Sequence, residues 1–215
     1  MRLDALAAAA GMALPSANDV PVTGFAIDNR KVAPGTVFGA FQGARVNGED
    51  FIPAAIAAGA IAVVARPEAR VEGAVHFAAS EPRRAFARLA ARFFMPVPET
   101  VVAVTGTNGK TSVATFTRQI WAALGHEAIN IGTTGIEGAW TAPSGHTTPD
   151  PVTLQKLLAA AAQGGVTHAA MEASSHGIDQ RRLDGVRLKA AGFTNLTQDH
   201  LDYHGTMEAY FEAKA

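Results

Sequence analysis

An apolar run rich in β-branched residues, residues 101–105, leads directly into a glycine-containing turn and then into a segment with helical periodicity. Gly106 and Gly109 allow the backbone to curl so that successive N–H groups point inward, and a helix N-terminus adds its positive dipole end. Lys110 would reach terminal phosphates, and the Thr111 hydroxyl would hold Mg²⁺. This stretch therefore predicts a phosphate-binding loop between a strand and a helix.

The general form of this motif has glycine five residues before Gly109, where this chain has Val104. The shorter pattern Thr-Gly-Thr-Asn-Gly-Lys-Thr at residues 105–111, called the glycine loop below, is nevertheless specific. The alternative is a Gly-Lys-Thr turn that only caps a helix. The residues predicted to bind nucleotide phosphates are Gly106, Thr107, Asn108, Gly109, Lys110, Thr111 and Ser112.

Composition limits the classes of protein to which this chain can belong. The chain has 215 residues, of which 48% are hydrophobic, enough for one large or two modest cores. A net charge of −1 without a basic stripe gives no reason to expect nucleic acid or an acidic membrane as partner. The absence of cysteine excludes disulfides and thiolate metal sites. Asp4 interrupts a short alanine-based start and no stretch is long enough to span a membrane, so we interpret the protein as cytoplasmic.

The first hundred residues alternate short strands and helices. Alternation and turn residues predict strands at 25–30, 36–41 and 61–65, and helices at 51–58 and 82–94. Pro96 and Pro98 then interrupt the pattern and suggest a linker. We therefore predict a small α/β domain at residues 1–97, followed by a second domain at 98–215.

The second domain repeats strand and helix, which predicts a mostly parallel sheet with helices on both faces and an α/β fold class. The helix after the glycine loop ends at Gly125 and has one apolar side, formed by Val113, Phe116, Ile120, Trp121 and Leu124. Asp150 and Pro151 begin another helix that ends at Gly164. Strands at 167–172 and 190–195 follow, and their carboxyl ends place two polar clusters, 172–176 and 195–200, on the same edge as the glycine loop.

Three side chains and one polar run in the second domain are candidates for chemistry. Glu172 follows an apolar strand and favours a contact to Mg²⁺, or else it is solvated at the strand end. His176 either contacts a ligand or is structural, and the dense run 199–204 is by itself a weak metal signal. Lys214 shares a helical face with Met207 and Tyr210, so it either extends along the aromatic rings or acts as a neutral amine.

Together these segments resemble the Mur ligases, the ATP-dependent amide-forming enzymes of peptidoglycan synthesis. The resemblance extends through nearly the whole chain and is carried by residues 27–30, 34–35, 48–51, 105–111, 147–150, 171–177 and 194–205. It is greatest to the ligases that add the third amino acid, meso-diaminopimelate or lysine, to UDP-N-acetylmuramoyl-L-alanyl-D-glutamate. Asn29 stands where family members often have serine, so the uridine contact at this position is expected to differ.

The resemblance implies a role for particular residues. It assigns the UDP moiety to the first domain, where Ile27, Asn29 and the loop Gly43, Ala44, Arg45 and Val46 would contact it. It assigns the muramoyl peptide to Thr147, Thr148, Ser174, Gln180 and Arg182. Glu172 and His200 correspond to magnesium positions beside Thr111, and Lys214 to a carbamylated lysine that would also ligate the metal. Lys110, His200 and Lys214 are thus the expected catalytic residues.

The implied reaction is attack of the substrate carboxylate on the γ-phosphate of ATP, followed by displacement of the acyl phosphate by an amine. Because family members have a third domain, we expect this chain to be a fragment that is inactive alone. We also expect it to be a monomer. Two alternatives remain open. One is another ligase of the superfamily, which adds D-Ala-D-Ala or extends folate with glutamate, and the other is a non-catalytic nucleotide-sugar-binding module.

Overall fold

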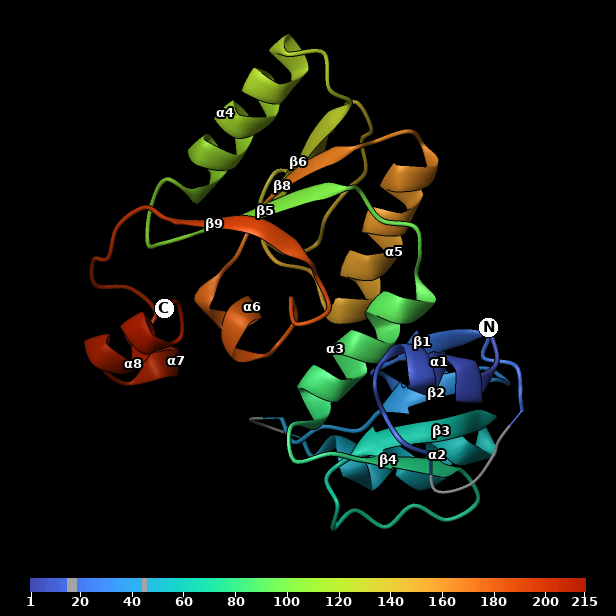
Figure 1. The fold of residues 1–215 in the computed structure, drawn as a ribbon. Coiled ribbons are helices and arrows are strands. Elements are labelled where there is room, and N and C mark those ends of the chain that lie inside the picture. Colours follow the sequence, from blue (N-terminus) through green and yellow to red (C-terminus); the bar gives the residue numbers. More distant parts are fainter. Residues whose placement is uncertain (15–18, 44–45) are drawn as a thin grey trace. The chain divides into compact units, whose positions relative to one another are not determined.

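The structure is a computed structural model that describes residues 1–14, 19–43 and 46–215 (Figure 1). Ala44 and Arg45, two of the predicted UDP contacts, lie outside the described residues. The chain forms two compact units, Met1–Phe93 and Phe94–Ala215. No described helix is both long and apolar enough to cross a membrane.

The first unit has a sheet of four parallel strands in the order in which they occur in the chain. The strands are β1 (Gly24–Ala26), β2 (Thr36–Gly39), β3 (Ala60–Ala65) and β4 (Val75–Ala78). Helix α2 (Ile52–Ala57) packs Ile52 onto Phe38 and Val63. Helices α1 (Leu3–Ala9) and α3 (Pro82–Phe93) contact each other, and Phe86 of α3 packs edge-on against Phe25 of β1. Apolar residues at helical spacing in α3 thus meet apolar residues of the sheet.

Two predictions for this unit were wrong in detail. The strand predicted at 25–30 ends at Ala26, and residues Asn29–Lys31 form the 3₁₀ turn η1. The reason is local, because the Asp28 carboxylate accepts the backbone N–H of Arg30 at 3.0 Å and so competes with strand pairing. The helix predicted from Phe51 begins earlier as the 3₁₀ turn η2 (Gly48–Phe51), and β4 was not predicted.

The second unit contains a mixed sheet of five strands in the order β7-β6-β8-β5-β9. The strands are β5 (Thr100–Thr105), β6 (Ala128–Gly132), β7 (Gly135–Gly138), β8 (His168–Glu172) and β9 (Leu188–Phe193). Only β7 runs antiparallel, to β6, while β6, β8, β5 and β9 pair in parallel. The predicted α/β class with a mostly parallel sheet is therefore confirmed.

Helices lie on both faces of this sheet (Figure 1). Helix α5 (Pro151–Gln163) packs Leu154 and Leu158 onto Ile129, Ile131 and Met171. Successive strand residues face opposite sides, and Asn130 accordingly faces α4 (Lys110–Ala123), where Arg118 donates to its side chain at 2.8 Å. Asp150 caps α5 as predicted, because its carboxylate accepts the N–H groups of Val152 and Thr153.

The apolar side of α4 does not pack into the core of this unit. Val113, Phe116, Ile120 and Leu124 are between 39% and 69% exposed, and the one buried residue of the helix is Ala114. A small side chain at the contact lets the helix lie close to the sheet. All six residues of β9 are exposed as well. Periodicity thus indicated the helix but not which of its sides meets the sheet.

Candidate functional site

The glycine loop connects the end of β5 to the start of α4 and requires glycine at one position in particular. Gly106 has φ +131°, and a Cβ atom there would lie 2.0 Å from the Thr194 hydroxyl oxygen. A larger residue would therefore meet both a backbone and a steric barrier. Gly109, with φ +85°, is the N-cap of α4. The loop can take this path only because these positions lack side chains.

The segment after β9 holds the glycine loop from the other side. Asn195 accepts the backbone N–H of Thr107 on its carbonyl at 2.9 Å and that of Asn108 on its side chain at 3.0 Å. The Thr194 hydroxyl donates to the Asn108 carbonyl at 2.6 Å. The carboxyl ends of the adjacent strands β5 and β9 are thus joined by hydrogen bonds, and two of the loop N–H groups are engaged in them.

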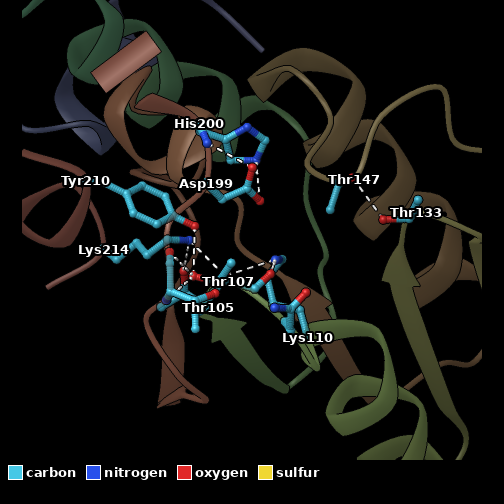
Figure 2. Close-up of polar contacts among 12 residues, drawn as sticks. Thr105, Thr107, Lys110, Thr133, Thr147, Asp199, His200, Tyr210 and Lys214 are labelled. Atoms are coloured by element: carbon cyan, nitrogen blue, oxygen red, sulfur yellow. Dashed lines mark hydrogen bonds and ion pairs between the residues drawn. The ribbon is translucent and has the colours of Figure 1, made fainter. Parts of the chain in front are cut away.

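Two lysine side chains converge on this loop (Figure 2). The Lys110 ammonium donates to the carbonyls of Gly106 at 2.9 Å and Thr107 at 2.8 Å. The Lys214 ammonium donates to the same Gly106 carbonyl at 2.9 Å and to the Thr105 hydroxyl at 3.4 Å. The result is a pair of cations at one loop, and their positive charges favour an anionic ligand.

Lys214 is buried, with 7% of its surface exposed, and its Nζ lies 4.8 Å from the ring centroid of Tyr210. Burial and, to a smaller extent, the positive charge of Lys110 lower the pKa of Lys214 to about 8, against the opposing effect of Asp199. The ammonium of Lys214 is therefore more easily deprotonated than that of an ordinary lysine.

Glu172 ends strand β8 with a carboxylate that is almost completely buried, 2% exposed. It accepts hydrogen bonds at Oε1 from the Thr111 hydroxyl at 2.9 Å and from the Thr133 N–H at 3.0 Å. The Glu172 carboxylate can approach the backbone at residue 132 because that residue is glycine. A Cβ atom there would lie 1.9 Å from Oε1 of Glu172. A buried carboxylate is thereby held next to a hydroxyl of the first turn of α4.

The predicted peptide-binding residues form a connected group beside Glu172. The Thr148 hydroxyl donates to the Glu172 carbonyl at 3.0 Å and accepts the Ser174 N–H at 2.9 Å. Arg182 donates to the Thr148 carbonyl at 2.6 Å and to the Gln180 side-chain oxygen at 2.8 Å. Thr147 forms a hydrogen bond with the Thr133 hydroxyl at 2.9 Å (Figure 2).

Ser112, one of the predicted phosphate contacts, is exposed on the first turn of α4.

His200 lies in an aromatic cluster that extends to Tyr210, whose ring centroid is 6.2 Å from that of His200. Its ring is 4.9 Å from that of His176, whose ring also lies 4.1 Å from that of Tyr203. Burial, and then the nearby imidazoles of His200 and His204, lower the pKa of His176. His200 also faces the Asp199 carboxylate at 3.6 Å. Within the described part of the chain, no three His, Asp or Glu side chains are grouped to hold a metal ion.

The first unit contains a cavity of about 560 Å³ at the predicted UDP contacts. It brings together Ile27, Asn29 and Val46, whereas Gly43, also predicted and described, is not among its lining residues. Arg83 and Phe41 also line it, with the Arg83 guanidinium 5.1 Å from the ring centroid of Phe41. The walls thus combine apolar and aromatic surface with cationic side chains, as a nucleotide requires.

Sequence reasoning missed two residues of the site in the second unit. Thr133 holds Glu172 and follows β6 directly, so its position at the carboxyl end of a parallel strand could have indicated it. Tyr210 donates its hydroxyl to Thr107 at 3.2 Å. Only its helical spacing to Lys214 was visible in the sequence.

In the second unit a parallel strand leads through the glycine loop into a helix, and polar side chains lie at the ends of the neighbouring strands. This arrangement defines the class of α/β proteins that bind ligands at the carboxyl edge of the sheet. The chain belongs to the Mur ligase family. The model of the Mur ligase middle domain matches residues 104–215, and that of the Mur ligase family catalytic domain matches residues 21–103.

Two curated relatives are UDP-N-acetylmuramoyl-L-alanyl-D-glutamate--2,6-diaminopimelate ligases. The protein of Zymomonas mobilis is 56% identical, and the match covers 99% of this chain and 44% of the relative. The protein of Rhizobium meliloti is 55% identical, and the match covers 91% of this chain and 40% of the relative. A solved structure with the same name has a TM-score of 0.84 at 34% identity and covers all of this chain and 44% of its own. The MurF ligase of Thermotoga maritima, solved in complex with ADP, shares the fold with a TM-score of 0.58 at 21% identity over 90% of this chain and 42% of its own. The chain thus spans less than half the length of these relatives.

Proposed function

We propose that this chain provides the UDP-substrate unit and part of the ATP unit of a ligase that joins 2,6-diaminopimelate to UDP-N-acetylmuramoyl-L-alanyl-D-glutamate. The observation that carries the proposal is the convergence of Lys110, Lys214 and Glu172 around one glycine loop. The relatives with this name, more than half identical over nearly the whole chain, support the choice of substrate and amino acid.

In this proposal Lys110 contacts the terminal phosphates of ATP. Its ammonium already lies over the loop backbone, bonded to two carbonyls, so a phosphate oxygen would replace weaker neutral acceptors. Arg182 would orient the anionic peptide substrate, since Gln180 and the Thr148 carbonyl hold its guanidinium at the same edge. Catalysis then depends on bringing two anions together in a fixed geometry and neutralising them.

The residues beside the glycine loop fit a magnesium ion. The buried Glu172 carboxylate and the Thr111 hydroxyl are hard oxygen donors 2.9 Å apart, the ligand type that Mg²⁺ prefers. Bound there, the ion would neutralise charge on the transferred phosphoryl group. His200, the other predicted magnesium contact, has side-chain contacts with Asp199, His176 and Tyr210 and none with Glu172 or Thr111 among the described residues, so its assignment rests on the resemblance alone.

We also propose that Lys214 is carbamylated. Its neutral amine would attack CO₂, forming an N–C bond and releasing one proton, and the product is an anionic oxygen ligand. Burial and the lowered pKa of Lys214 support this reaction. A carbamate keeps one N–H on Nζ, so it could donate to the Gly106 carbonyl or to the Thr105 hydroxyl, but not to both as the ammonium does.

The test is calorimetry on the purified chain with UDP-N-acetylmuramoyl-L-alanyl-D-glutamate and, separately, with ATP and Mg²⁺. We expect both to bind. Asn29→Ala should weaken only the first, and Lys110→Met only the second, with a melting temperature within a few degrees of wild type because loop substitutions cost little. Binding of the UDP-linked substrate without ATP would favour a nucleotide-sugar-binding module, and binding of neither would contradict the proposal.

A further inference from the structure

We infer that Tyr210 is a positioning residue for the glycine loop, which it holds at two consecutive residues. Its hydroxyl fixes the Thr107 side chain, and its ring fixes the Lys214 ammonium that bonds Gly106. The positioning role itself depends only on these contacts. Its consequence for ATP rests on the proposed function.

The hydrogen bonds around Thr107 leave the Tyr210 hydroxyl one role. A threonine hydroxyl has one proton to donate and two lone pairs to accept. That of Thr107 donates to the Thr197 carbonyl at 3.1 Å and accepts the Thr197 N–H at 2.9 Å. The second lone pair takes the Tyr210 O–H at 3.2 Å, so Tyr210 is the donor and Thr107 is fully bonded.

Burial makes this contact more than incidental. Tyr210 is 1% exposed and Thr107 is 8% exposed, so water cannot readily replace either partner. Phenylalanine would fill nearly the same volume as Tyr210. A buried tyrosine hydroxyl without a hydrogen-bond partner would lower the stability of the fold, so the partner matters. That partner belongs to the glycine loop, 103 residues earlier in the chain. Figure 2 shows the Tyr210 hydroxyl directed towards Thr105 and Thr107 and the Lys214 head group beside it.

The ring of Tyr210 provides the second contact. The Lys214 ammonium lies over its face at 4.8 Å from the centroid, a cation–π distance. From there the same ammonium reaches the Gly106 carbonyl at 2.9 Å. Helix α8 (Met207–Glu212), which carries Tyr210, therefore supports the loop through a direct and an indirect bond. Any substitution that removes only the hydroxyl should take away one of the three hydrogen bonds of the Thr107 hydroxyl and leave the Lys214 contact in place.

The chain contains two tyrosines, and the more exposed one, Tyr203, provides a control. Tyr203 donates its hydroxyl to the Asp179 carboxylate at 2.7 Å, in the aromatic cluster around His176. We would compare Tyr210→Phe and Tyr203→Phe in the purified 215-residue chain without ligand. The readout is amide hydrogen exchange at Thr107 and Thr197, measured by NMR.

Tyr210→Phe should accelerate exchange at these two amides by roughly fivefold to tenfold, the effect of one lost buried hydrogen bond. Tyr203→Phe should leave both rates unchanged. In a Thr107→Val background, adding Tyr210→Phe should have no further effect, because the acceptor is already absent. Unchanged exchange in Tyr210→Phe, or equal acceleration throughout both units, would overturn the inference.

Calorimetry with ATP and Mg²⁺ on the same variants separates this inference from the proposed function. A roughly fivefold weaker affinity in Tyr210→Phe, with unchanged affinity for the UDP-linked substrate, would support both. Faster exchange with unchanged ATP affinity would support the positioning role and contradict the assignment of this loop to ATP.

Discussion

The ammonium groups of Lys110 and Lys214 donate to the same oxygen, the carbonyl of Gly106, and both distances are 2.9 Å. Two cations that share one acceptor repel each other, and a protonated state beside another cation is less favourable. The charge of Lys110 therefore adds to burial, the larger cause, in lowering the pKa of Lys214 to about 8. The arrangement holds positive charge where an anion would relieve the repulsion.

Removing the charge of Lys110 should raise the pKa of Lys214. In Lys110→Met one repelling cation is absent, so the protonated form of Lys214 becomes more favourable and its pKa moves from about 8 towards 10.5. An NMR titration of the Lys214 side chain measures this change. Lys189→Met, on the exposed strand β9, is the control and should have no effect. An unchanged pKa in Lys110→Met would mean that burial alone sets the value.

Lys214 should react with CO₂ in preference to the exposed lysines. Carbon-13 bicarbonate added to the purified chain should give a carbamate signal that strengthens as the pH rises towards about 8, where the neutral amine becomes abundant. The signal should be absent in Lys214→Met and retained in Lys189→Met. A signal that survives Lys214→Met would assign the modification to another amine.

Gly132→Ala should destabilise the second unit by displacing the Glu172 carboxylate. The added Cβ would lie 1.9 Å from Oε1 of Glu172 in a fully packed position, so about 1–3 kcal/mol of unfolding free energy should be lost. Gly192→Ala in β9 is the matched control, because a Cβ there meets no atom within 4 Å. Urea unfolding near neutral pH compares the two variants. Equal losses would show that the carboxylate can move without cost.

Asp28 should make the first unit sensitive to acid. Its side-chain hydrogen bond to Arg30, with the Arg30 backbone N–H as a second donor, lowers its pKa from 3.8 to about 2. Because the folded value lies below the unfolded one, this stabilisation is complete above about pH 3.8 and is lost as the pH falls through about 2. The contribution is small, about 1 kcal/mol or less, because the Arg30 guanidinium is exposed.

The measurement is the unfolding free energy of wild type and Asp28→Asn near neutral pH and at about pH 3. The difference between the two proteins should shrink at the lower pH. A difference that does not depend on pH would mean that the Asp28 carboxylate acts only as a neutral acceptor for the turn.

Local features of the sequence predicted much of the fold. Residues 101–112 predicted a strand, a glycine loop and a helix, and β5 and α4 confirm the two elements. Asp150 and Pro151 correctly marked the start of α5, because capping depends on residues only two or three positions apart. The prediction of a strand at 25–30 was wrong because of a similar local bond: the Asp28 side chain accepts the N–H of Arg30, two positions on, and so favours a turn.

Alternation and helical spacing also placed the polar clusters at one edge of the sheet, because parallel strands end on the same side. Tertiary structure alone decided which of these groups meet. The bond from Tyr210 to Thr107 joins residues 103 positions apart, and that from Lys214 to Gly106 joins residues 108 apart. Such contacts depend on strand order and helix packing, which no local pattern encodes. The sequence by itself therefore determined the fold class and the elements around the glycine loop, because these depend on local pattern, whereas the packing of α8 against the loop decided how the two lysines and Tyr210 form one site.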